Sequence, residues 1–147
     1  MTDNKQQLTL TRVFDATPEK VWNMWTKPQL FAQWYGKPWE VPADSVEMDV
    51  QEGGTWKSTT IAEGNTINFT GVFKEVKKPQ KLVMTIKNPE NPNDPNFEMV
   101  TVILRDLGGG KTEMVFTQSG NLPPEEYEVG LRKGWGGFFD HLAKAIQ

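Results

Sequence analysis

The sequence contains no cysteine and a single histidine, His141. The lack of cysteine excludes disulfide bridges, thiolate nucleophiles, and zinc or iron–sulfur sites with cysteine ligands. With one histidine, metal sites built from several histidines are also excluded, and a serine-type catalytic relay would have to use His141. We therefore expect no metal and no cofactor, and the residue types and their spacing identify no catalytic residue.

Long apolar runs are also missing, and residues 1–7 are polar. The sequence therefore predicts no membrane insertion and no signal peptide, so we expect a cytoplasmic location. Sixteen basic and nineteen acidic residues leave a net charge of −3, and the basic residues are scattered. A nucleic-acid-binding protein usually carries a basic stripe, so we expect no nucleic-acid partner.

Hydrophobic residues make up 37% of the chain and aromatic residues 11%, a composition typical of a folded protein. The length of 147 residues predicts one domain over residues 1–147, with its core at about 8–146.

The hydrophobic pattern predicts an order of elements dominated by strands. Thr17 and Pro18 predict the start of a helix, and Pro28 predicts a second, short one. Strands are expected at 8–14, 45–50, 55–62, 66–76, 81–87, 97–107 and 111–119. The proline-rich segment 88–96 predicts a long loop, which could form the mouth of a cavity.

A final helix is expected from about residue 123 to 146, because apolar residues recur there at helical spacing. Its expected buried stripe consists of Leu131, Trp135, Phe138, Leu142 and Ala145. An antiparallel sheet has one apolar face that another element must cover, and only this helix is long enough to cover it. The residues thus predict an α+β fold, a curved antiparallel sheet wrapped around the C-terminal helix.

Six tryptophans are many for a chain of this length. We expect Trp22, Trp25 and Trp34 to be structural and Trp39, Trp56 and Trp135 to lie nearer any cavity. The last helix contains four glycines, at 130, 134, 136 and 137, although glycine destabilises a helix interior. They predict close packing, space for a ligand, or a bend, and the sequence does not choose among these.

Several short motifs, taken in order, carry a resemblance to a known family. They are residues 17–22 (TPEKVW), 27–36 (KPQLFAQWYG), 53–56 (GGTW), 71–76 (GVFKEV), 78–83 (KPQKLV) and 109–114 (GGKTEM), followed by Gly134-Trp135. The chain resembles START-like domains of the SRPBCC superfamily, and within it the branch named after homologue 1 of the activator of the heat-shock chaperone ATPase. The resemblance implies the helix-grip fold, with about seven strands, two short helices after strand 1 and a hydrophobic cavity. Members of the superfamily bind lipids, hormones or polyketides, and some are cyclases or dehydratases.

The leading hypothesis is non-catalytic binding of a small hydrophobic or aromatic ligand between the sheet and the C-terminal helix. Inward strand positions and the helix stripe give the expected lining. It consists of Trp39, Trp56, Phe69, Phe73, Met84, Val102, Phe116, Tyr127, Leu131 and Trp135, with Gln118 as a polar group that orients the ligand.

Two alternatives remain open. One is an enzyme of the cyclase or dehydratase type acting on a polyketide-like or cyclic substrate, with Glu75, His141 or Tyr127 moving protons. It predicts an ionisable side chain inside the cavity. The other is a module that binds a chaperone or another protein, and it predicts an exposed apolar patch of several hundred Å².

Overall fold

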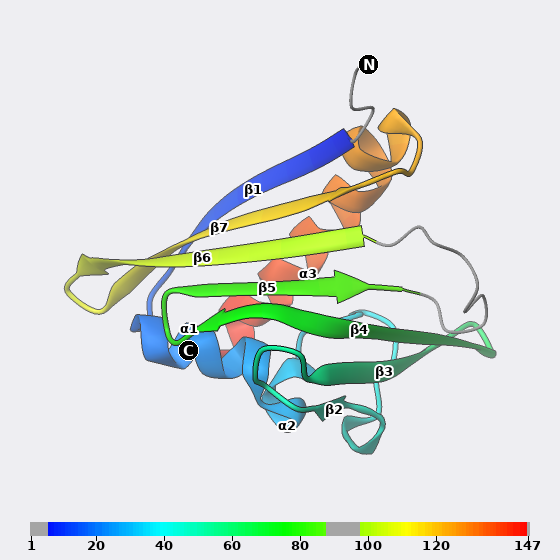
Figure 1. Cartoon of the computed structure of the whole chain (residues 1–147), viewed down its shortest axis with the longest axis horizontal. Helices are drawn as coiled ribbons and strands as arrows, with labels where there is room; N and C mark the ends of the chain where they lie inside the picture. Colours follow the sequence, from blue (N-terminus) through cyan, green and yellow to red (C-terminus); the bar gives the residue numbers. More distant parts are fainter. Residues whose placement is uncertain (1–5, 88–97, 147) are drawn as a thin grey trace.

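The computed structural model describes residues 6–87 and 98–146, which form one antiparallel sheet with a long helix across one face (Figure 1). The strands are β1 (Gln6–Phe14), β2 (Glu47–Met48), β3 (Thr55–Ala62), β4 (Asn65–Lys77), β5 (Lys81–Ile86), β6 (Glu98–Gly108) and β7 (Lys111–Gly120). The helices are α1 (Pro18–Thr26), α2 (Pro28–Phe31) and α3 (Leu131–Ala145). The seven strands lie in the order β1-β7-β6-β5-β4-β3-β2. This is the predicted helix-grip fold.

The two short helices follow β1 and begin as the sequence predicts. The Thr17 hydroxyl accepts a hydrogen bond from the Lys20 amide at 3.4 Å, and Pro18 occupies the first turn of α1. Pro28 occupies the same place in α2. Trp22, Trp25 and the other apolar residues of α1 are buried, so the pair closes one end of the layer between sheet and helix.

The prediction of a strand at 45–50 is wrong in length. The observed strand is shorter, because only Glu47–Met48 pairs with β3. Residues Ala43–Ser45 instead form a 3-10 turn. The Ser45 hydroxyl donates to the Pro42 carbonyl at 2.7 Å and fixes this turn. The other predicted strands are confirmed to within two residues at each end. The predicted loop at 88–96, with its suggested role as a mouth, lies outside the described residues.

The core lies between the inner face of the sheet and α3. Its centre is Trp25, whose ring contacts those of Trp34, Phe116, Trp135 and Phe139 at centroid distances of 4.8 to 6.2 Å. Contacts of this kind add to the free energy gained by burying the rings. Trp22, Trp25 and Trp34 are thus core residues, as predicted.

Of the five residues in the predicted stripe of α3, Trp135 and Leu142 are buried, whereas Leu131, Phe138 and Ala145 are only partly buried. Phe139 is fully buried, whereas Phe138 is only partly buried. Both lie within one turn of Trp135, three and four residues on, so helical spacing alone does not distinguish them. A π-helical turn at Glu126–Gly130 precedes α3. Two hydrogen bonds join β1 to α3: the Arg12 guanidinium donates to the Asp140 carboxylate at 2.8 Å and to the Gly136 carbonyl at 3.1 Å.

A side chain interrupts the pairing of β4 with β5. The Trp56 indole crosses from β3 and donates to the Thr85 carbonyl of β5 at 2.9 Å. It passes Gly71 of β4, where an added Cβ would overlap both the indole nitrogen and the Thr85 carbonyl oxygen. The Thr85 hydroxyl in turn accepts from the Val72 amide at 2.9 Å. Trp56 therefore takes the place of ladder hydrogen bonds at this point.

Candidate functional site

A pocket of about 330 Å³ lies between the sheet, α3 and the segment that follows α2. Strands β3 to β7 supply one wall and α3 the opposite wall. The lining residues are Tyr35, Gly36, Trp39, Thr60, Ile67, Phe69, Ile86, Glu98, Gln118, Leu122, Leu131, Trp135 and Phe138. Trp39, Ile67 and Leu122 are between 38% and 42% exposed, so the pocket is open to solvent along this rim.

Three further hollows, of about 270 to 380 Å³, lie over β2 to β5. All three are lined by Thr70 and by charged side chains, which include Glu47 and Lys57 in two of the hollows and Lys74 and Lys87 in the third. They are surface grooves with mixed polar walls. The pocket beneath α3 combines aromatic walls with a few polar groups, which is the usual composition of a small-molecule site. We therefore take it as the candidate site.

Five of the eleven residues expected in the lining lie in this pocket. They are Trp39, Phe69, Gln118, Leu131 and Trp135. They come from four separate parts of the chain, so the fold alone brings them together. The polar residue expected to orient a ligand, Gln118, is among them.

The other six expected lining residues do not border the pocket. Trp56, Phe73, Met84, Val102, Phe116 and Tyr127 are all buried, and each is at most 2% exposed. Their inward orientation was predicted correctly. For Phe116 the reason is a ring between it and the pocket, because Trp135, which lines the pocket, contacts it at 4.5 Å.

Several lining residues were not expected from the sequence. Tyr35 and Gly36 follow α2 and belong to the motif at residues 27–36, but they were not among the expected lining residues. Thr60 shares the inward parity of Trp56 on β3, which was the available signal. Glu98 lies two residues after the predicted loop and pairs with Ile86 across β5 and β6. No local pattern indicates that these residues meet.

A hydrogen-bonded network lies at one end of the pocket. The Trp135 indole donates to Gln118 Oε1 at 2.7 Å, and Gln118 Nε2 donates to Glu98 Oε1 at 3.0 Å. The Tyr127 hydroxyl donates to the same Glu98 oxygen at 2.7 Å, and the Asn121 amide donates to Glu98 Oε2 at 3.2 Å. The Glu98 carboxylate thus accepts from three donors, which fixes Gln118 and Trp135 in the pocket wall.

Both tyrosines of the chain have a raised pKa. Burial, together with the hydrogen bond to Glu98, raises the pKa of Tyr127 to about 12. Burial alone raises the pKa of the Tyr35 hydroxyl. In both cases the low-dielectric surroundings disfavour the phenolate. The two hydroxyls therefore remain protonated donors across the physiological range.

These pKa values predict how the protein responds to alkali. A tyrosine whose pKa is higher in the folded than in the unfolded state stabilises the fold below pH 10, and this contribution is lost as the pH rises toward the folded value. We expect no tyrosinate absorbance to develop around pH 10 while the protein is folded. The absorbance should rise together with the loss of far-UV circular dichroism. A reversible titration near pH 10 in the folded protein would contradict these surroundings.

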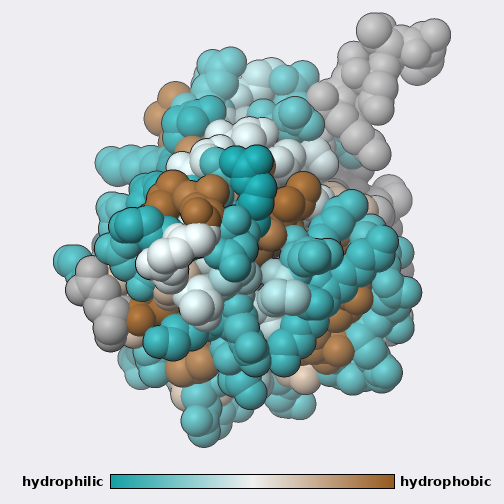
Figure 2. Space-filling model, turned by 90° about the vertical axis from the view of Figure 1, so that its left-hand side faces the viewer, coloured by the Kyte–Doolittle hydropathy of each residue, from teal (hydrophilic) through white to brown (hydrophobic). Residues whose placement is uncertain are grey.

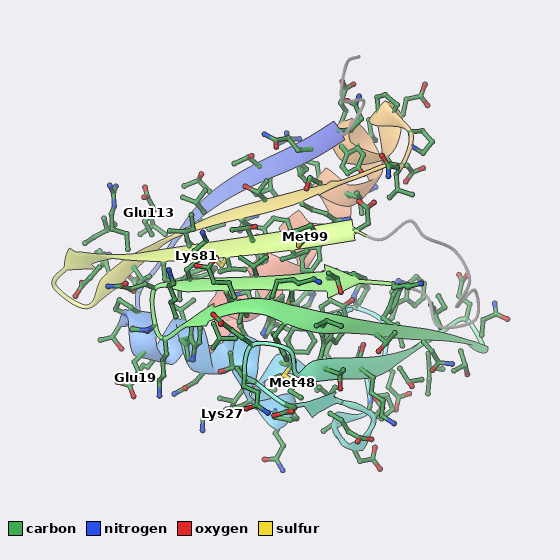
Figure 3. All side chains as sticks on the ribbon, viewed as in Figure 1. Glu19, Lys27, Met48, Lys81, Met99 and Glu113 are labelled. Atoms are coloured by element: carbon green, nitrogen blue, oxygen red, sulfur yellow. The ribbon has the colours of Figure 1, made fainter. Side chains whose placement is uncertain are left out.

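Glu75 and His141, considered as proton carriers, lie outside the pocket lining. Glu75 pairs with Lys77 at 3.2 Å and with Lys81 at 3.4 Å. Lys81, labelled in Figure 3, begins β5, and α3 lies behind the strands in this view. The hydrogen bond from Lys77 is the largest cause that lowers the pKa of the Glu75 carboxyl, so this group stays ionised. Glu75 is therefore a surface ion-pair partner.

Within residues 6–87 and 98–146, no three aspartate, glutamate or histidine side chains come together as metal ligands. Across the same residues, no helix has the length and apolar character that a transmembrane helix needs.

Comparison with known proteins identifies the family of this chain. The model of the family "Activator of Hsp90 ATPase homolog 1-like protein" matches residues 15–147. The chain belongs to this family. The resemblance found in the sequence motifs is therefore confirmed, and with it the START-like SRPBCC type of domain.

Solved structures of similar proteins show the same fold as this family member. A protein from Nitrosomonas europaea is 26% identical, with a TM-score of 0.83 over 99% of this chain and 96% of that one. A protein from Chromobacterium violaceum is 24% identical, with a TM-score of 0.81 over 96% of each chain. One from Staphylococcus aureus is 20% identical, with a TM-score of 0.80 over 97% and 94%. The comparison with curated proteins gave no significant match.

Proposed function

We propose that this family member binds a small hydrophobic or aromatic molecule, without catalysis, in the pocket between the sheet and α3. The observation that carries the proposal is the pocket itself, about 330 Å³ and lined by aromatic and aliphatic side chains from both layers. Its volume lies at the lower end of the range for small-molecule sites, about 300 to 1,000 Å³. The proposed partner is therefore one small apolar molecule per chain.

The walls supply the binding free energy that such a role needs. Burying apolar surface contributes about 25 cal/mol per Å², and no ligand charge is required. The rings of Trp135 and Phe138 contact each other at 5.3 Å, and Tyr35 contacts both. A guest that fits against these rings would lose its own apolar hydration without displacing a protein side chain.

Titration with the neutral fluorophore N-phenyl-1-naphthylamine tests this proposal. Tryptophan emission overlaps the absorbance of this probe, and Trp39 and Trp135 both line the pocket. We expect saturable quenching of tryptophan emission and a matching rise in probe emission, with one probe bound per chain. If the folded protein gave no saturable response with this probe, the proposed function would be wrong.

Catalysis is less well supported by the contacts. An enzyme acting on a cyclic substrate needs an acid or base that is free to exchange protons in the pocket. Glu98 is the carboxylate among the described lining residues, and it already accepts hydrogen bonds from Gln118, Tyr127 and Asn121. These bonds favour a structural role for Glu98, so binding is the function that the site supports best.

A protein-interaction role, to which the family name points through the Hsp90 ATPase, calls for a contiguous exposed apolar patch. Figure 2 shows one end of the molecule, where hydrophobic spots are separated by hydrophilic side chains. Of the exposed large apolar residues, Trp39, Ile67 and Leu122 belong to the rim of the pocket. These observations support ligand binding more directly than chaperone binding.

A further inference from the structure

Two hydroxyl groups of the pocket lining have no hydrogen-bond partner among the described residues, those of Tyr35 and Thr60. The two residues are only 5% and 6% exposed. In the described part of the chain, the fully enclosed side-chain atoms without a partner are Trp25 Nε1 and Ser58 Oγ. The Tyr35 and Thr60 hydroxyls are not among them, so both border open space. Because buried polar groups normally have partners, these hydroxyls are available to a ligand.

The Tyr35 ring is held in place by other rings. Phe31 stacks on it at a centroid distance of 4.5 Å, and Phe138 and Trp135 contact it at 5.5 and 5.8 Å. The hydroxyl therefore has a fixed direction before any ligand arrives, which lowers the entropic cost of a hydrogen bond. A phenol is protonated at neutral pH, and burial raises the pKa of the Tyr35 hydroxyl further, so the hydroxyl is present as a donor.

The charges around the pocket select against anionic ligands. Among the described lining residues, Glu98 alone carries a formal charge, and no lysine, arginine or histidine is present. A ligand carboxylate or phosphate would lose its hydration there without meeting a cation. It would also be repelled by the Glu98 carboxylate.

The aromatic side chains of the lining favour a flat ring system as the ligand. Tyr35, Trp39, Phe69, Trp135 and Phe138 all contribute rings to it. Offset or edge-to-face contacts with such rings are worth about 0.5 to 1.5 kcal/mol beyond the area that they bury. A cyclic aromatic guest would gain these contacts, whereas a flexible aliphatic chain would not.

Given the proposed function, on which this step rests, we infer that the ligand is an uncharged aromatic molecule with an oxygen acceptor. A carbonyl, ether or hydroxyl oxygen of the ligand accepts the hydrogen bond of the Tyr35 hydroxyl, and the Thr60 hydroxyl is the second polar partner. The same lining disfavours fatty acids and other apolar anions whose charged group would have to enter the pocket.

Three naphthalenes of nearly equal shape test this inference by displacing bound N-phenyl-1-naphthylamine. 2-Acetylnaphthalene has a carbonyl acceptor, 2-isopropenylnaphthalene replaces that oxygen by carbon, and 2-naphthoate is an anion. We expect the ketone to bind about fivefold to tenfold tighter than the hydrocarbon, the worth of one net hydrogen bond. At neutral pH the naphthoate should bind at least about tenfold more weakly than the ketone.

Tyr35→Phe should remove the preference for the ketone over the hydrocarbon, while the affinity for the hydrocarbon stays nearly constant. The matched control is Tyr127→Phe, the same change at the other tyrosine, whose hydroxyl bonds to Glu98 and does not line the pocket. Because Tyr127 helps to hold Glu98 at the pocket wall, both affinities can fall in that variant, but their ratio, which is the ketone preference, should persist.

The outcomes separate the two proposals. If the fluorophore binds but Tyr35→Phe leaves the ketone preference unchanged, or if naphthoate binds best, the inference about the ligand class is overturned and the proposed function stands. If the fluorophore itself fails to bind to the folded protein, both are overturned.

Discussion

Replacing Gly71 by alanine is expected to lower the free energy of unfolding by about 3 kcal/mol. A Cβ at this position would overlap the Thr85 carbonyl oxygen and the Trp56 indole nitrogen, and would lie 2.7 Å from the Thr85 carbonyl carbon. Two of these neighbours are backbone atoms, so β4 and β5 would have to separate and the Trp56–Thr85 hydrogen bond would break. For a chain of this size the midpoint of thermal unfolding should fall by about 10 °C.

The same chemical change at Gly134 is the matched control, and its expected effect has the opposite sign. Gly134 lies inside α3, and a Cβ added there would meet no atom within 4 Å. Gly134→Ala should therefore raise the free energy of unfolding by about 1 kcal/mol, the difference in helix propensity. Thermal unfolding of both variants checks the pair. Equal stability of Gly71→Ala and the wild type would show that Trp56 does not cross the sheet at this point.

Filling the pocket from two opposite sides should abolish most ligand binding. Ile86 lies in the sheet wall and Leu131 in the α3 wall. In the double variant Ile86→Trp/Leu131→Trp, two indoles would occupy space that the guest needs. We expect its affinity for N-phenyl-1-naphthylamine, measured by probe emission, to fall by about tenfold or more.

A second double variant adds the same two indoles elsewhere. Ile103 on β6 and Val129 in the π-helical turn are 44% and 66% exposed, and neither lines the pocket. Ile103→Trp/Val129→Trp should therefore bind the probe as the wild type does. Equal loss of affinity in the two double variants would argue against the pocket as the binding site.

Much of the fold follows from local patterns in the sequence. Alternation predicts the long strands, since one face of the sheet is buried and every second residue on that face must be apolar. Thr17, Pro18 and Pro28 mark the helix starts because their capping and backbone properties act locally. The strand at 45–50 was overestimated because the Ser45 hydroxyl bonds to the backbone and competes with pairing, which alternation does not reveal.

The candidate site follows from the sequence only in part. Inward parity identifies residues that face the core, but it does not show where the core stops being filled. The sequence predicts both Trp56 and Trp135 to lie near a cavity. In the structure the Trp56 indole instead crosses β4 and bonds to the Thr85 carbonyl, whereas Trp135 borders the pocket. The glycines of α3 left three interpretations open. At Gly134 and Gly137 an added Cβ would meet open space, so close packing is not the reason for glycine at these two positions.

The central claim is that an apolar guest enters the space between the sheet and α3, and the six tryptophan indole N–H signals in a ¹H–¹⁵N NMR spectrum test it most directly. Trp39 and Trp135 line the pocket, whereas Trp22, Trp25, Trp34 and Trp56 lie in the core. On addition of N-phenyl-1-naphthylamine, the account predicts the largest shifts for Trp39 and Trp135. Unmoved signals for both, at probe concentrations that saturate the fluorescence change, would contradict it.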